Sequence, residues 1–341
     1  MANELGYRDE AAAEYDRAFA HVSSHFLPFL LNTAGVEPGM KALDIATGTG
    51  LAAAECLRAV GASGRVVAAD MSEAILEKAK QRLSSAPNVT FAVEDGQALT
   101  FVDSSFDALI CSLGLMFFPD PALGLLEFLR VLRPEGRAAA SVLTVPERSY
   151  NGRINAVIAK QLPSIGEATA KTFLLGDAAH LRQLLESAGF RNVKISRQTH
   201  RFRLPSFDAY FRPFERGGAS TGQAYLTLPQ SARDAVRKEV QASLGDTGGP
   251  VEVEVEFQFA KRPMLLTQLS AVGLRAEDAC DGRSDLSSPA ADCSYAICGE
   301  RPWRTSCANW LVLVRLAGQA LVVEVRLDPR TESSGATEDD D

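Results

Sequence analysis

Two glycines between a predicted strand and a predicted helix constrain the fold of this chain more than any other feature. The strand KALDIA (41–46) runs into Thr47-Gly48-Thr49-Gly50, and a helix is predicted over residues 51–60. Glycine lets the backbone approach a ligand closely and adopt torsion angles closed to other residues. Asp70 follows the next strand, RVVAA (65–69), where a carboxylate can accept hydrogen bonds from both hydroxyls of a ribose. This order of elements predicts a cofactor that contains adenosine.

Strands and helices alternate from about residue 41 to residue 204, which is the pattern of a parallel sheet covered by helices. We therefore expect an α/β fold with a Rossmann-like, doubly wound sheet and helices on both faces. Ser72 and Asp120 are placed to cap helices. The strand at 251–262 alternates apolar and acidic residues, which predicts a half-solvated position near the sheet edge. The other predicted strands are 88–93, 106–111, 137–145 and 192–204, and the other helices are 9–33, 72–83, one from Pro121, and one from Asp177 to Gly189.

Asp44, near the end of the first strand, distinguishes between adenosine cofactors. A nicotinamide dehydrogenase normally has an all-apolar strand before G-x-G-x-x-G, which holds a pyrophosphate. Here the third small residue is Ala53, and the Asp44 carboxylate suits the ammonium group of a methionine better than a pyrophosphate. The chain also has no Tyr-x-x-x-Lys pair. These residues favour S-adenosylmethionine (SAM) as the cofactor.

Four runs of sequence resemble the methyltransferase type 11 family, which includes the ubiquinone/menaquinone-biosynthesis methyltransferases. They are LDIATGTG, VVAADMSEAILEKA, FAVEDGQALTF and SFDALICSLGLMFFPDPALGLLEFLRVLRPEGR. The resemblance covers residues 12–262 and is most specific over 41–145. It implies a class I, SAM-dependent methyltransferase with a seven-stranded sheet whose last strand is antiparallel. Pro134-Glu135-Gly136 departs from the family's Pro-Gly-Gly, in a loop expected to lie away from the cofactor.

The resemblance also implies the positions that bind the cofactor. Residues of the glycine loop would line the methionine and ribose, Asp70 would hold the ribose, and Met71 would pack on the adenine. Residues 95–97 would meet the adenine edge, and Ser112 would lie near the methionine end. Tyr15 resembles the residue that helps to close the pocket in this family. With Asp44 included, the expected cofactor-binding residues are Asp44, Thr47, Gly48, Gly50, Asp70, Met71, Asp95, Gly96, Gln97 and Ser112.

Methyl transfer from a sulfonium is an in-line displacement, which a protein accelerates mainly by holding both reactants in the reactive geometry. A general base is needed only when the acceptor must lose a proton. No residue is clearly indicated as that base. The candidates are Tyr150, just after the fifth strand, and His200, which as a strand histidine is more simply explained as structural.

The acceptor is expected to be a small molecule, with an aromatic, quinone-like or isoprenoid compound as the possible classes. Apolar residues follow the fourth strand, and an aromatic stripe occupies residues 207–214. These side chains could wall an acceptor pocket, and ordinary core packing explains them equally well. With Tyr15, the expected acceptor-contacting residues are Tyr15, Met116, Phe117 and Tyr210.

The charge distribution argues against a nucleic-acid substrate. From residue 263 onward the chain carries seven Arg, no Lys and thirteen acidic residues, a net charge of −6, which leaves −2 for residues 1–262. A nearly neutral body offers no basic surface for phosphates. The Asn/Asp-Pro-Pro-aromatic motif, which amino-methylating nucleic-acid enzymes have after the fourth strand, is also absent. No apolar run reaches the ~18 residues of a membrane span, and the polar N-terminus does not resemble a signal peptide, so a cytoplasmic protein is expected.

Three regions are predicted along the chain. Residues 1–40 form an N-terminal capping helix region, and residues 41–262 form the methyltransferase domain, with an insertion of two helices at 205–250 as the acceptor cap. Residues 263–341 form an acidic appendage expected to be poorly ordered, with a hairpin around residues 317–319 as its regular structure. The spacing of its cysteines does not match common zinc sites, so no metal is expected. These cysteines are Cys280, Cys293, Cys298 and Cys307.

Two other classes of function stay open on the sequence. A nicotinamide-dependent Rossmann oxidoreductase would carry a bound dinucleotide. A non-catalytic SAM-binding protein would bind SAM and never form S-adenosylhomocysteine.

Overall fold

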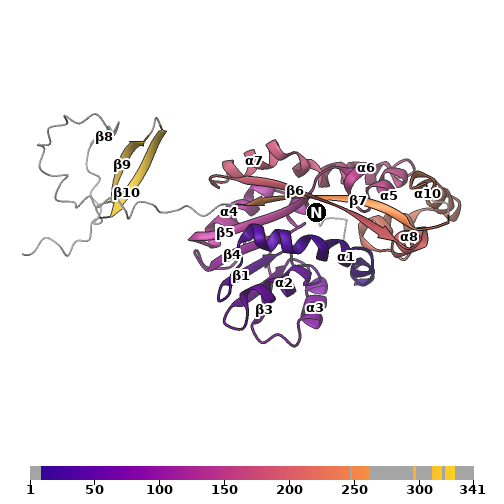
Figure 1. Ribbon diagram of the computed structural model, residues 1–341, viewed down its shortest axis with the longest axis horizontal. Helices are drawn as coiled ribbons and strands as arrows, with labels where there is room; N and C mark the ends of the chain where they lie inside the picture. Colours follow the sequence, from indigo (N-terminus) through magenta and orange to yellow (C-terminus); the bar gives the residue numbers. More distant parts are fainter. Residues whose placement is uncertain (1–8, 246–247, 262–294, 297–308, 317–318, 327–341) are drawn as a thin grey trace, which may run out of the picture. The chain divides into compact units, whose positions relative to one another are not determined.

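The computed structural model describes residues 9–245, 248–261, 295–296, 309–316 and 319–326 (Figure 1). The chain divides into two compact units, Met1–Leu266 and Thr267–Asp341.

A seven-stranded sheet in the order β3-β2-β1-β4-β5-β7-β6 forms the centre of the first unit. Strand β7 runs antiparallel to both of its neighbours, β5 and β6, while β1 to β5 pair in parallel. The predicted α/β fold and its antiparallel last strand are therefore confirmed. The strands are β1 (Lys41–Ile45), β2 (Arg65–Asp70), β3 (Val89–Val93), β4 (Phe106–Ser112), β5 (Leu132–Leu143), β6 (Lys194–Leu204) and β7 (Val251–Lys261).

Helices cover both faces of the sheet, so each central strand buries the side chains on both of its faces. Along β1, Ala42 belongs to one apolar cluster and Leu43 to the other, as the alternation of side chains in a strand requires. The first cluster includes α1 (Asp9–Ala34) and α2 (Leu51–Val60), and the second includes α4 (Pro121–Val131) and α7 (Ala178–Ser187). Asp44, two residues after Ala42, thus lies on the α1/α2 face.

The predicted helix starts are confirmed at their capping side chains. Ser72 accepts a hydrogen bond from the Ile75 amide at the start of α3 (Glu73–Arg82). Asp120 accepts from the amides of residues 122 and 123 at the start of α4, where Pro121 needs no N–H partner. Asp177 begins α7 in the same way. These local bonds satisfy amides that the helix itself leaves free.

Further helices gather at the end of the sheet where β5 and β6 finish (Figure 1). The insertion at 205–250 contains three helices instead of the two predicted ones: α8 (Phe207–Glu215), α9 (Ala219–Thr227) and α10 (Gln230–Ser243). Residues 146–176 add α5 (Gly152–Ile158) and α6 (Pro163–Thr172), which have no counterpart in the sequence prediction. Helix α6 has no buried residue, so its sequence carries no apolar period that would reveal it. We call α5, α6 and α8–α10 the cap helices.

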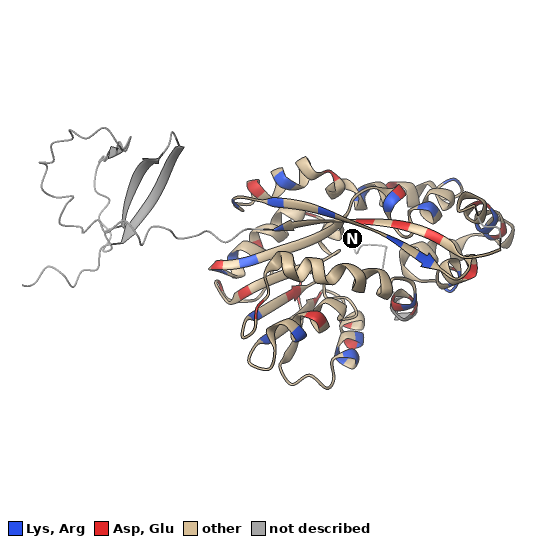
Figure 2. Ribbon diagram, viewed as in Figure 1, with Lys and Arg blue, Asp and Glu red and all other residues tan. Residues whose placement is uncertain are grey.

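The sequence places residues 251–262 near the sheet edge, and β7 is the second strand from it, between β5 and the edge strand β6. The expectation of a half-solvated strand is wrong for most of β7, because only Glu252 among its residues is exposed. The acidic residues of β7 are instead neutralised by basic neighbours. Arg201 of β6 pairs with Glu252 and Glu254, and Arg148 pairs with Glu256. Figure 2 shows the resulting mixture of charges along β6 and β7. A strand whose acidic side chains form ion pairs with its neighbours can therefore show the same alternation of apolar and acidic residues as a strand with a solvent-exposed face.

The segment Pro134-Glu135-Gly136 is part of β5 and is not a separate loop. It lies between Leu132, which pairs with Phe106, and Arg137, which pairs with Ala108, so the ladder is irregular there. This is at the amino end of β5, away from the glycine loop that follows the carboxyl end of β1, so the departure from the family pattern stays outside the site.

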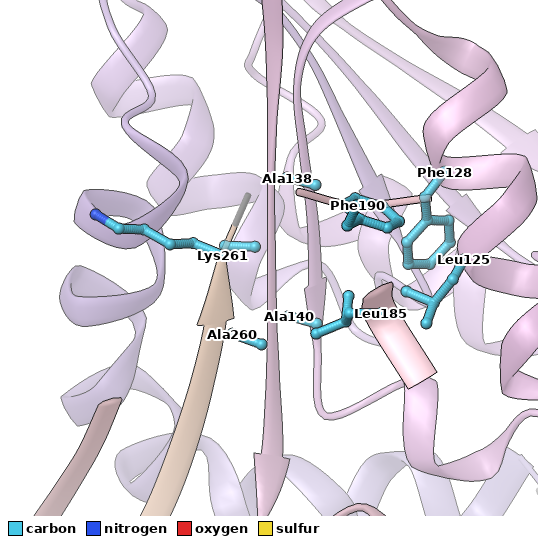
Figure 3. A pocket seen from close by; sticks show the side chains of 9 residues that line it. Leu125, Phe128, Ala138, Ala140, Leu185, Phe190, Ala260 and Lys261 are labelled. Atoms are coloured by element: carbon cyan, nitrogen blue, oxygen red, sulfur yellow. The ribbon is translucent and has the colours of Figure 1, made fainter. Parts of the chain in front are cut away.

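A small apolar void lies between α4, α7 and the strands β5 and β7 (Figure 3). Its volume is about 10 Å³, and Leu125, Phe128, Leu185 and Phe190 contribute to its lining. A space of this size holds at most about one water molecule. It is part of the packed core and offers no room for a cofactor.

The second unit contains a three-stranded antiparallel sheet in the order β10-β9-β8. The predicted hairpin is confirmed, because Leu316 of β9 pairs with Gln319 of β10. The strands are β8 (Tyr295–Ala296), β9 (Asn309–Leu316) and β10 (Gln319–Arg326). The four cysteines considered as metal ligands lie outside the described residues.

Candidate functional site

The two glycines in the loop after β1 are explained by different structural requirements. Both adopt positive φ, +57° at Gly48 and +82° at Gly50. A Cβ atom at Gly48 would meet no atom within 4 Å, so this residue borders open space. A Cβ atom at Gly50 would lie 3.0 Å from the Ala79 Cβ, so this residue lets α2 pack against α3. Gly48 is therefore the glycine whose hydrogen leaves room for a ligand.

Asp44 is a completely buried carboxylate beneath this loop. One of its oxygens accepts a hydrogen bond of 2.6 Å from the Thr47 hydroxyl, and the other is buried and makes no hydrogen bond of normal distance and angle. Burial raises the pKa of Asp44 to about 7, and the charge of Asp70 adds to the rise, while the Thr47 hydroxyl and the Ala53 backbone N–H lower it. A buried carboxylate with an unused oxygen and a raised pKa is suited to an incoming cation. This observation fits the ammonium group of SAM.

Asp70 ends β2 and faces the same loop. Its carboxylate accepts hydrogen bonds from the amides of Gly48 (2.9 Å) and Ser72 (3.0 Å), and burial raises its pKa. Each carboxylate oxygen has a second lone pair, so capacity remains for ribose hydroxyls. Met71, the next residue, is 72% exposed, which leaves its side chain free to cover a flat ring.

The segment after β3 is joined to the start of α4. The Asp95 carboxylate accepts from the Gln97 amide at 2.9 Å, and the Gln97 side-chain oxygen accepts from the Asp120 amide at 2.6 Å. A Cβ atom at Gly96 would lie 2.3 Å from the Phe118 ring, so Gly96 is explained by close packing. Asp95 is exposed and Gln97 is partly exposed. Their polar edges are thus accessible, while Gly96 serves as support.

The segment after β4 packs directly on the end of β1. A Cβ atom at Gly114 would lie 2.4 Å from that of Ala46, immediately before the glycine loop. Ser112, the last residue of β4, is partly buried and pairs with Ser141 in the neighbouring strand. Met116 is 9% exposed, whereas Phe117 is 60% exposed. Phe117 is therefore available to a ligand, and Met116 supports it from within.

Tyr15 and Phe19 bring helix α1 to the same end of the sheet. Their rings stack at 5.2 Å, and Phe19 in turn contacts Tyr150 and Phe214 edge-on. Burial raises the pKa of Tyr15 to about 12, so its hydroxyl stays protonated at neutral pH. The helix thus joins the cap helices through a continuous aromatic cluster.

Tyr150 and Tyr210 follow the ends of β5 and β6, as the sequence places them, but both side chains are buried. Tyr150 is 3% exposed, and burial raises its pKa, so it stays protonated and is unsuited to accept a proton. Tyr210 is fully buried, and its hydroxyl donates to the Tyr150 carbonyl oxygen at 2.8 Å. His200 stacks on His25 of α1 at 3.7 Å, in the strand that β4, β5 and β7 separate from β1. These residues stabilise the cap and the edge of the sheet.

Sequence reasoning missed Asp16 and Arg82, which contact the loop through Thr49. Thr49 is part of the recognised motif, but its partners are far away in sequence and belong to no motif. Across the described residues, no cluster of three or more His, Cys, Asp or Glu is arranged to hold a metal ion.

The comparisons with known proteins show the family to which the chain belongs. The model of the ubiE/COQ5 methyltransferase family matches residues 22–202, just over half of the chain. The chain belongs to the ubiE/COQ5 methyltransferase family. It is an enzyme that uses SAM, and the two alternative functions are not favoured.

Two relatives and one solved structure illustrate the likeness. A ubiquinone/menaquinone biosynthesis C-methyltransferase UbiE of Shewanella pealeana is 30% identical over 186 residues, which are 50% of this chain and 74% of that protein. A demethylmenaquinone methyltransferase of Staphylococcus aureus is 33% identical over 178 residues, which are 49% of this chain and 74% of that protein. The crystal structure of a putative methyltransferase from Bacillus halodurans has a TM-score of 0.47 at 20% identity, covering 70% of this chain and 99% of that one.

Among the helices of the described residues, none combines the length and the apolar character that spanning a membrane requires.

Proposed function

We propose that this methyltransferase binds SAM along the carboxyl ends of β1, β2 and β4 and transfers its methyl group to a small apolar acceptor of quinone type. The observation that carries the cofactor site is the buried, unpartnered oxygen of Asp44 beside the open space at Gly48. The names of the relatives, which act in ubiquinone and menaquinone synthesis, support the acceptor class.

Each proposed cofactor residue has a distinct role. Asp44 would hold the ammonium group, Asp70 the ribose hydroxyls, and the exposed Met71 the adenine face. Asp95 and Gln97 would offer polar edges to the adenine, and Thr47, Gly48 and Ser112 would border the methionine portion. Bound SAM supplies a methyl group on a sulfonium, and the protein contributes position and exclusion of water.

The acceptor is proposed to enter between Phe117 and the N-terminal part of α1, which carries Tyr15. Phe117 is 60% exposed and lies three residues after Gly114, which packs on Ala46 at the start of the cofactor loop. An exposed apolar ring there favours an aromatic or prenylated acceptor over a charged metabolite. We propose that residues 205–250 act as the acceptor cap within a domain of residues 41–262, preceded by the helix region 1–40 and followed by the appendage 263–341. The near-neutral charge of residues 1–262 supports a small molecule over nucleic acid.

The test is a transfer assay with methyl-labelled SAM, read by mass spectrometry of the products. The acceptors offered are a hydroquinone with a short prenyl chain, the same hydroquinone without it, phosphoethanolamine, and a mixed RNA. We expect label in the hydroquinones, with a lower KM for the prenylated one, and a higher KM for it in Phe117→Ala. Label only in phosphoethanolamine or RNA, with SAM bound normally, would refute the acceptor class.

A further inference from the structure

Each of the three residues immediately before Gly50 is held by a different carboxylate. Thr47 donates its hydroxyl to Asp44 at 2.6 Å, and Gly48 donates its amide to Asp70 at 2.9 Å. Thr49 donates its hydroxyl to Asp16 at 2.6 Å. The first two carboxylates belong to the sheet beneath the loop. The third belongs to α1, a separate helix that precedes the sheet in the chain.

Asp16 is part of a closed set of bonds with Thr49 and Arg82, which we call the loop clamp. The second oxygen of Asp16 forms an ion pair with the Arg82 guanidinium, and Arg82 also donates its Nε–H to the Thr49 carbonyl oxygen at 2.7 Å. Thr49 is 2% exposed, whereas the side chains of Asp16 and Arg82 are about one-third exposed. Both the hydroxyl and the carbonyl of one buried loop residue are thus held, from α1 and from α3.

The clamp acts where the backbone is least constrained by its own residues. Thr49 lies between Gly48 and Gly50, and both glycines adopt positive φ. Glycine has access to more of the torsion map than other residues, so ordering it carries a larger entropic cost. Bonds from outside the loop are therefore needed to keep its amides and the Gly48 opening in one arrangement.

We propose that Asp16 is a positioning residue for the cofactor: it fixes Thr49, and through Thr49 the loop, and it ties the position of α1 to the shape of that loop. The inference rests on the proposed SAM site. The same helical turn carries Tyr15, and Phe19 follows one turn later, so the bond that orders the loop also holds the aromatic part of α1 over this end of the sheet. Loss of the clamp weakens SAM binding although Asp16 does not itself contact the proposed cofactor position.

The experiment measures the Kd for SAM by calorimetry in Asp16→Ala, Asp16→Asn, Thr49→Val and the double variant Asp16→Ala/Thr49→Val. The matched control is Glu37→Ala. It removes a carboxylate that forms an ion pair with Arg137, at a position just after the C-terminal end of α1 and away from the loop. Thermal melting is recorded for each protein. Asparagine keeps an oxygen for the Thr49 hydroxyl and loses the charge that Arg82 uses, so it separates the two contacts of Asp16.

We expect Asp16→Ala and Thr49→Val each to raise the Kd about tenfold and Asp16→Asn to raise it less. The Kd of the double variant should be about 10- to 20-fold above that of the wild type, because both substitutions break the same bond. Two independent effects would instead multiply to a ~100-fold rise. Glu37→Ala should change the Kd less than about twofold.

An unchanged Kd in a cooperatively melting Asp16→Ala protein, or a fully multiplicative double variant, would overturn the proposal. If Asp16→Ala does not fold, Asp16→Asn and Thr49→Val decide the question by the same criterion. Failure of the wild-type protein to bind SAM would instead refute the proposed cofactor site, so the two failures are distinguishable.

Discussion

Substitution of Asp44 by Asn should have opposite effects on SAM binding and on the stability of the free protein. The carboxylate is completely buried, and burial raises its pKa to about 7 from an ordinary value of 3.8. If the ionised form binds the ammonium group, affinity follows the ionised fraction. With a pKa of about 7 that fraction is about 3% at pH 5.5 and about 76% at pH 7.5, so SAM affinity should rise about 25-fold, or about 1.9 kcal/mol.

The contribution of Asp44 to the stability of the free protein changes with pH in the opposite direction. The folded-state pKa of Asp44 is above its unfolded value, so its contribution to the free energy of unfolding is fully present below about pH 4 and is lost as the pH rises through about 7. Asparagine stays neutral and retains an oxygen for the Thr47 hydroxyl. We therefore expect Asp44→Asn to melt at a higher temperature than the wild type at pH 8 without SAM, and to bind SAM more weakly at that pH.

The assay is calorimetric titration with SAM from pH 5.5 to pH 7.5, together with thermal melting at each pH. The SAM affinity of the wild type should rise with pH as calculated. The affinity of Asp44→Asn should rise much less with pH, and the remaining rise is due to Asp70, whose pKa is also raised. An affinity of the wild type that does not change with pH, or an equal slope in both proteins, would refute this role of Asp44.

Three further outcomes follow from the site and the division of the chain. Asp70→Ala removes charge-assisted hydrogen bonds and should weaken SAM binding at least ~10-fold in calorimetry; an unchanged Kd would contradict the cofactor assignment. Gly48→Val should weaken binding further, because its side chain would fill the open space beside the loop; Gly61→Val, which has a similar φ of +66° and no atom within 4 Å, is the matched control and should bind SAM normally. A chain that ends at Arg262 should melt cooperatively and keep the SAM affinity of the full chain; aggregation, or a loss of more than ~10-fold, would make the appendage an integral part of the fold.

Most of the sheet and the position of the cofactor loop could be predicted from the sequence because their signals are local. Asp44 bonds Thr47 three residues later, Ser72 and Asp120 cap the helices that follow them, and the positive φ of the loop glycines is a preference of each residue itself. Their torsion preferences and short-range hydrogen bonds determine strand, loop and helix before any distant contact forms. For the same reason the hairpin of β9 and β10 was predictable from its turn.

Tertiary structure decided the features that depend on residues far apart in the chain. The alternation in β7 is compatible with an exposed edge or with ion pairs, and only the pairing with Arg201 and Arg148 distinguishes them. Tyr150 and Tyr210 follow strand ends where ligands bind, yet packing against α1 and the cap helices buries both. Asp16 meets Thr49 across 33 residues and Arg82 across 66. Such contacts leave no period or motif in the sequence, because the chain between the partners folds by its own local rules and brings them together only when the sheet and its helices have packed.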